Sequence, residues 1–158
     1  MTVAAVVLAA GASTRYGRPK QHELLPAVLA QLGDLDAVVV EGAHPLDVDA
    51  RIVHADQWER GPGASLRAGL AALGEHVTHA LVVLADGPAL DPRAVQRLIE
   101  HRNDAPVLAA SYDGTRDHPV LIARGVWDAI PDEGGRALEP VLVDCSDLEP
   151  PGDVDYSS

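Results

Sequence analysis

The sequence predicts a three-layer α/β/α domain with a mainly parallel sheet, and two observations support this prediction. First, short continuous runs rich in Val, Leu and Ala alternate with segments whose apolar residues recur at helical spacing. Continuous apolar runs are typical of strands that are buried on both faces, and their alternation with helices favours parallel strands. Second, the chain has 158 residues of which 47% are hydrophobic, which is enough for one domain with a substantial core.

Each expected element follows from a local pattern. The predicted strands are residues 3–8 (VAAVVL), 37–40 (AVVV), 80–85 (ALVVLA), 107–110 (VLAA) and 120–122 (VLI), and helical spacing covers residues 24–32, 66–73 and 95–99. The third helix has a clear start, because Asp91 is a good N-cap residue and Pro92 suits the first helical position. Ser65 is either the N-cap of the second helix or a nucleotide contact at its N-terminus, and the sequence leaves both open.

These elements are expected to form one Rossmann-like domain over residues 1–158, with its ligand at the carboxyl ends of the strands. Asp and Glu number 24 against 12 Lys and Arg, so the net charge is −12 and no nucleic acid is expected as partner. No apolar stretch approaches the ~20 residues that cross a bilayer, and no secretory leader is visible. A cytoplasmic location without membrane association is therefore expected. Cys145 is the only cysteine, which excludes an internal disulfide.

The loop after the first predicted strand is the most informative segment. Residues 8–20 read LAAGASTRYGRPK and include Lys20, the only lysine in the chain. A single lysine at the end of a glycine-containing loop favours a point charge on a phosphate. Gly11 has no Cβ, so the backbone N–H groups near it can approach a phosphate closely. Arg15 is a second candidate phosphate ligand, although either cation could be a solvated loop charge.

A second candidate follows the predicted strand 80–85, where the chain reads Leu-Ala-Asp-Gly-Pro over residues 84–88. Asp86 stands at the strand end, where a carboxylate beside a phosphate loop is well placed to hold Mg²⁺. The alternative is that Asp86 opens a turn, because Asp-Gly is a common turn pair. The two interpretations are not separated by this segment alone.

Together these segments resemble the MobA-like NTP transferases, and they are most similar to the molybdenum cofactor cytidylyltransferase branch. Residues 8–20 match the family pattern LAAGxSxRxGxPK at every fixed position, and residues 84–88 are similar to the LGDQP strand end. Further similarity lies in residues 58–70 (WERGPGASLRAGL), 118–120 (HPV, against NPV), 132–136 (DEGGR, against GDxGAR) and 153–155 (DVD, against DIDTPED). The resemblance therefore spans most of the chain.

The resemblance implies the nucleotide-diphospho-sugar transferase type of fold and a Mg²⁺-dependent transfer of a nucleotidyl group to a phosphorylated acceptor, with release of pyrophosphate. The Leu-Ala-Ala-Gly start and the Pro-Lys end of the loop favour CTP over GTP, and molybdopterin is the implied acceptor. His118 would contact that acceptor, and Asp86 with Asp155 would bind the metal. A molybdoenzyme or its chaperone is the implied protein partner. The implied nucleotide-binding residues are Ala9, Ala10, Gly11, Arg15, Lys20, Ser65 and Asp86, of which Arg15, Lys20 and Asp86 would be catalytic.

The sequence also departs from the family pattern. Residues 21–32 are compressed, His118 stands where the family has Asn, and the sequence stops at Ser158, where the family continues into a helix after the second metal aspartate. Three alternatives therefore stay open: another phosphorylated acceptor such as a sugar phosphate, an NAD(P)H-dependent oxidoreductase on the same fold, and a catalytically impaired nucleotide-binding homologue. The oxidoreductase is disfavoured, because no GxGxxG is followed by an acidic residue ~20 positions later.

Overall fold

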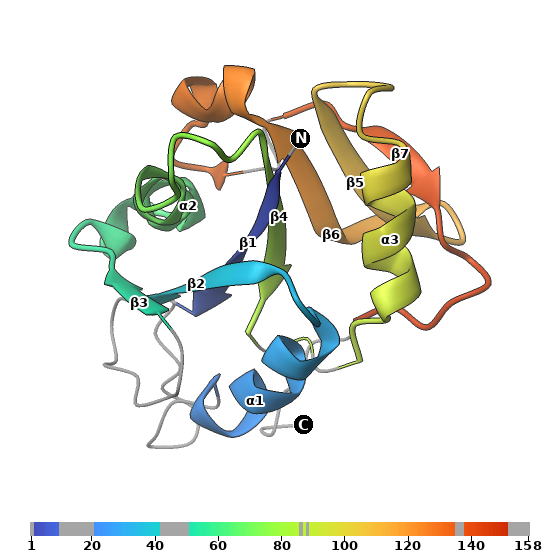
Figure 1. Ribbon diagram of the computed structural model, residues 1–158, viewed down its shortest axis with the longest axis horizontal. Helices are drawn as coiled ribbons and strands as arrows, with labels where there is room; N and C mark the ends of the chain where they lie inside the picture. Colours follow the sequence, from blue (N-terminus) through green and yellow to red (C-terminus); the bar gives the residue numbers. More distant parts are fainter. Residues whose placement is uncertain are drawn as a thin grey trace.

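A mixed, mainly parallel sheet forms the centre of the molecule. The computed structural model describes residues 2–9, 21–41, 51–85, 87, 89–134 and 138–151. Within these residues a seven-stranded sheet runs in the order β3-β2-β1-β4-β6-β5-β7 (Figure 1). The strands are β1 (Val3–Ala9), β2 (Asp36–Glu41), β3 (Arg51–His54), β4 (His79–Leu84), β5 (Val107–Tyr112), β6 (Thr115–Ala123) and β7 (Val141–Asp144). Strands β3, β2, β1 and β4 are parallel, β6 is antiparallel to β4 and β5, and β7 is parallel to β5.

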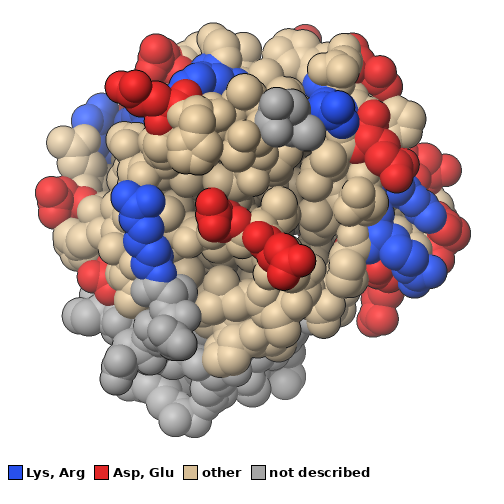
Figure 2. Space-filling model, viewed as in Figure 1, with Lys and Arg blue, Asp and Glu red and all other residues tan. Residues whose placement is uncertain are grey.

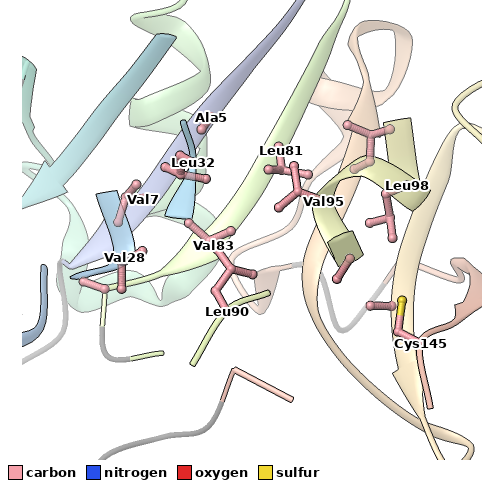
Figure 3. Close-up of a cluster of buried hydrophobic side chains, with 14 of the residues drawn as sticks. Ala5, Val7, Val28, Leu32, Leu81, Val83, Leu90, Val95, Leu98 and Cys145 are labelled. Atoms are coloured by element: carbon pink, nitrogen blue, oxygen red, sulfur yellow. The ribbon is translucent and has the colours of Figure 1, made fainter. Parts of the chain in front are cut away.

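Helices cover both faces of the sheet, which confirms the predicted three layers. Helices α1 (Gln21–Gln31) and α3 (Pro92–Glu100) pack on one face, and α2 (Pro62–Ala71) with the 3₁₀ helix η2 (Arg124–Ala129) packs on the other. A second 3₁₀ helix, η1 (Trp58–Arg60), precedes α2. Side chains of β1 alternate between the two cores: Ala5 and Val7 lie with α1 and α3, and Ala4 and Val6 lie with α2. Figure 3 shows the first of these two clusters.

Helix α2 approaches the sheet closely at Gly69. A Cβ built on Gly69 would lie 2.6 Å from Val6 Cγ1 and 2.8 Å from Val40 Cγ2, well inside ordinary contact. The absence of a side chain at this residue therefore lets the helix backbone rest directly on the valines of β1 and β2.

The five predicted strands are all present, but two further strands were missed. Strands β3 and β7 have four residues each and lie at the two edges of the sheet. Strand β3 (RIVH) has only two apolar residues, and Val141 and Leu142 of β7 (VLVD) are exposed, so neither strand is a continuous buried apolar run. Strand β6 is longer than the predicted residues 120–122, because the polar residues Thr115 to Asp117 pair with β5 on the far side of an irregularity between Ala109 and Ala110.

Surface charges around α3 are paired locally. The guanidinium of Arg97 donates two hydrogen bonds to the carboxylate of Asp147, at 2.6 and 2.7 Å. Blue and red side chains accordingly lie side by side in this region of Figure 2. No helix within the described ranges is long and apolar enough to cross a membrane.

The predicted N-cap of α3 is confirmed and carries a testable consequence. The Asp91 carboxylate accepts a hydrogen bond from Arg93 N at 2.9 Å. Hydrogen bonds from the Arg93 side chain and main chain hold the pKa of Asp91 below its usual range. We expect Asp91→Ala to lower the free energy of unfolding by about 1 kcal/mol at pH 7, measured by urea denaturation.

Because the pKa of Asp91 is lower in the folded state, its stabilisation is fully present above the ordinary aspartate pKa and is lost as the pH falls through the folded value. The difference between wild type and Asp91→Ala should therefore shrink below about pH 4. A difference that stays constant from pH 7 to pH 2 would contradict an ionised cap.

Candidate functional site

The parallel strands bring their carboxyl ends to one edge of the sheet. Register places Ala9 of β1 beside Glu41 of β2, and Glu41 beside His54 of β3. At the other side of β1, Leu8 pairs with Leu84 of β4, and Ala85 N donates to Leu8 O at 3.0 Å. Ligands of open α/β sheets bind at this edge, so it is the candidate site.

Two of the predicted motifs lead directly to this edge. Ala9, a predicted nucleotide contact, is the last residue of β1 and is 4% exposed. Ala85 and Gly87, which flank Asp86 in the sequence, follow β4, and Gly87 N donates to Leu84 O at 3.2 Å. The end of the first strand and the end of the aspartate-bearing strand are therefore neighbours. The predicted residues Ala10, Gly11, Arg15, Lys20, Asp86 and Asp155 themselves lie outside the described residues.

The C-terminal segment returns to the same region. Ala89 N, shortly after β4, donates a hydrogen bond to Pro151 O at 3.0 Å. This contact joins the residues after β4 to the segment that continues toward Asp155 in the sequence. Within the described ranges, no group of three or more His, Cys, Asp and Glu side chains could hold a metal ion, and both predicted metal ligands fall outside them.

Ser65 lies in the first turn of α2, but it is not the N-cap. The N-cap is Gly61 at φ 133°, Pro62 is the first helical residue, and Ser65 is therefore the fourth. Of the two roles that the sequence left open, the N-cap role is excluded, because the helix begins at Pro62, three residues before Ser65. The Ser65 side chain is buried, with the residue 4% exposed, and its hydroxyl forms no hydrogen bond with a described residue. A buried hydroxyl normally has a partner, so this one is a candidate ligand contact.

His118 lies on β6 beside the carboxyl end of β4 and opposite the irregularity between Ala109 and Ala110 of β5. Val120, two residues further along β6, pairs with Val82 of β4. The carbonyl of His118 accepts a hydrogen bond from Tyr112 Oη at 3.1 Å. Its main-chain N donates to the Asp117 carboxylate at 2.7 Å, and hydrogen bonding to His118 lowers the pKa of Asp117. The His118 side chain is partly exposed. The residue predicted to contact the acceptor therefore lies near the carboxyl end of β4, and its role stays a prediction.

A network at the start of α2 was not predicted. The Asp132 carboxylate accepts hydrogen bonds from Arg67 Nη2 at 2.6 Å and from Arg60 Nη2 at 3.1 Å, and both arginines lower the pKa of Asp132. Arg67 also donates to Ile130 O at 2.7 Å, and Arg60 donates to Gln57 Oε1 at 2.8 Å. The similarity of residues 132–136 to GDxGAR marks this segment, but no local pattern joins Asp132 to arginines so distant in sequence.

A cavity of about 360 Å³ lies at the opposite, amino edge of β1 and β2, where Asp36, Arg51 and His76 are among its lining residues. It is formed by the starts of these strands and by the residues after α2. It is therefore separate from the candidate site.

Comparisons with known proteins agree with the fold and identify the family. Residues 5–142 match the model of the MobA-like NTP transferase domain. No curated protein sequence matches the chain. Among solved structures, the homolog of Rv0371c from Mycobacterium sp. strain JC1 has 27% identity and a TM-score of 0.76, covering 97% of this chain and 90% of its own.

Two further structures show the same fold at lower identity. Rv0371c of Mycobacterium tuberculosis in complex with manganese has 23% identity and a TM-score of 0.70, with 91% of this chain and 89% of that chain covered. A 4-diphosphocytidyl-2C-methyl-D-erythritol synthase of Anaerococcus prevotii has 13% identity and a TM-score of 0.65, with 96% and 91% covered. With the family match covering most of the chain, the protein belongs to the MobA-like NTP transferase domain family and is a nucleotidyltransferase.

Proposed function

We propose that this protein is a metal-dependent cytidylyltransferase that transfers CMP from CTP to molybdopterin or another phosphorylated small molecule and releases pyrophosphate. The observation that carries the proposal is the adjacency of two strand ends: Ala9 ends β1, and Ala85 follows β4 and donates to Leu8 O. The phosphate loop and Asp86 follow these two ends in the sequence. The manganese complex of Rv0371c supports a divalent metal ion.

In this proposal the residues after β1 bind the triphosphate. Backbone N–H groups from Ala9 to Gly11 approach the phosphates, and Arg15 with Lys20 neutralises the charge of the departing pyrophosphate. Ser65 binds the nucleotide from the first turn of α2, and His118 contacts the acceptor from β6. These groups align an acceptor phosphate oxygen with the α-phosphorus.

Asp86 and Asp155 would hold the divalent metal ion, since carboxylates are the protein ligands that Mg²⁺ and Mn²⁺ accept. The ion would supply Lewis acidity at the phosphates. The hydrogen bond from Ala89 N to Pro151 O supports this pairing. Four further residues bring the chain from Pro151 to Asp155, and an extended segment of that length spans up to about 14 Å.

Calorimetric titration with CTP, GTP and NADPH, each with and without Mg²⁺ or Mn²⁺, tests the proposal. We expect metal-dependent binding of CTP that is lost in Asp86→Ala. Lys20→Ala should weaken CTP binding by about 10- to 100-fold, because a charge-assisted hydrogen bond is removed. Asp128→Ala serves as the matched control, since Asp128 is an exposed aspartate of η2 and should leave binding unchanged.

Turnover is measured as pyrophosphate release with molybdopterin or a sugar phosphate as acceptor. NADPH binding that is indifferent to metal, with no CTP binding, would contradict the proposal in favour of an oxidoreductase. CTP binding without turnover on any acceptor would indicate an impaired homologue.

A further inference from the structure

The segment Pro131–Gly134 is in backbone contact with the start of α2. Gly63 N donates to Asp132 O at 2.9 Å. A Cβ built on Gly63 would lie 1.6 Å from Pro131 O, and one on Gly61 would lie 2.4 Å from Asp132 O. No side chain fits between the two segments, so the position of one determines the position of the other.

Asp132 is the residue that ties these segments together by its side chain. Its two carboxylate oxygens bind different elements: Oδ2 accepts from Arg60 of η1, and Oδ1 accepts from Arg67, two residues beyond Ser65 in α2. The carboxylate therefore bridges the residues on both sides of the first turn of α2. Each of its oxygens is engaged by an arginine, which favours a role through α2 over direct contact with a ligand.

The first turn of α2 is located where the nucleotide is expected. Residue Ala55, directly after β3, hydrogen-bonds to Glu41 O at the carboxyl edge, and the chain then enters α2 through η1. The buried Ser65 hydroxyl, without a partner among the residues described, lies in this turn.

We propose that Asp132 is a positioning residue for nucleotide binding, which holds residues 61–65 at the carboxyl edge by bridging Arg60 and Arg67. This inference rests on the proposed function. For the nucleotide affinity of a variant without the Asp132 charge, it predicts the opposite of what charge repulsion alone predicts. Removal of a negative charge near a triphosphate would by itself tighten binding, whereas loss of positioning weakens it.

The experiment compares the Kd and the KM for CTP with Mg²⁺ in wild type, Asp132→Asn, Asp132→Glu and Asp147→Asn. Asp147 is the matched control, because it is an exposed aspartate bound by two hydrogen bonds from Arg97, away from α2. We expect Asp132→Asn to raise both constants about 3- to 30-fold with kcat changed less than about 2-fold. Asp147→Asn should leave them unchanged, and Asp132→Glu should restore part of the affinity.

Each outcome decides the inference. Wild-type or tighter binding by Asp132→Asn, or equal weakening in Asp147→Asn, would overturn it while leaving the proposed function intact. Failure of the wild type to bind any NTP would overturn the proposed function and the inference with it. If Asp132→Asn does not fold, Arg60→Gln removes only the more exposed arm of the bridge, and an unchanged Kd in that variant overturns the inference.

Discussion

Leu81→Ala is expected to lower the free energy of unfolding by about 3 kcal/mol. Leu81 is fully buried in β4, at the middle of the sheet between β1 and β6, and it packs in the core under α1 and α3 (Figure 3). Truncation removes buried methyl groups and leaves a cavity that the paired strands on either side cannot close, and such changes cost about 2–5 kcal/mol. Urea denaturation at constant m-value measures the loss.

The control is Leu142→Ala, which makes the same chemical change on the edge strand β7. Leu142 is 45% exposed, so its truncation should cost less than about 1 kcal/mol. An equal decrease in the free energy of unfolding in Leu81→Ala and Leu142→Ala would contradict the expectation that the cost of truncation depends on burial.

Gly63→Ala is expected to destabilise the protein by about 1–3 kcal/mol or more, because it forces atoms into occupied space. The new Cβ would lie 1.6 Å from Pro131 O and 2.9 Å from Gly134 N, and both are backbone atoms that no rotamer change can move. The segment must shift as a whole, which breaks the hydrogen bond from Gly63 N to Asp132 O. We expect weaker CTP binding in the same variant, measured by calorimetry.

Gly125→Ala provides the comparison. A Cβ on this exposed glycine of η2 meets nothing within 4 Å, so the stability should change by less than about 0.5 kcal/mol. A Gly63→Ala protein as stable as Gly125→Ala would contradict the direct contact between α2 and residues 131–134.

The strands that could be predicted from the sequence are those buried on both faces, because burial on both faces gives a continuous apolar run. Strands β1, β2 and β4 were predicted within one residue at each end, because both of their faces are buried and almost every residue is apolar. Strands β3 and β7 were missed because an edge strand of four residues needs neither a long apolar run nor burial on both sides. The antiparallel direction of β6 was missed for a different reason. Direction depends on the hairpin with β5, whose turn at Asp113 and Gly114 has positive φ at both residues.

The candidate site likewise has residues that a local sequence pattern reveals and residues that only the fold brings together. Patterns confined to one segment, such as residues 8–20 and 84–88, could be recognised in the sequence, and their strands end at one edge as expected. The role of Ser65 as N-cap was wrong, since Gly61 caps the helix. Asp132 was missed because its partners lie 65 and 72 residues away, where only the fold brings them together. The phosphate and metal roles of Arg15, Lys20, Asp86 and Asp155 stay predictions.

Gly69, the glycine of α2 that lies against the sheet, has a consequence for the position of the helix. Gly69 fixes the height of the helix above Val6 and Val40, and it lies one turn beyond Ser65. A methyl group at Gly69 would act as a spacer under the helix and tilt its first turn away from the sheet edge. Because Gly69 packs directly on Val6 and Val40, we expect the position of the first turn of α2, and with it the nucleotide affinity in the proposed function, to depend on core residues of β1 and β2.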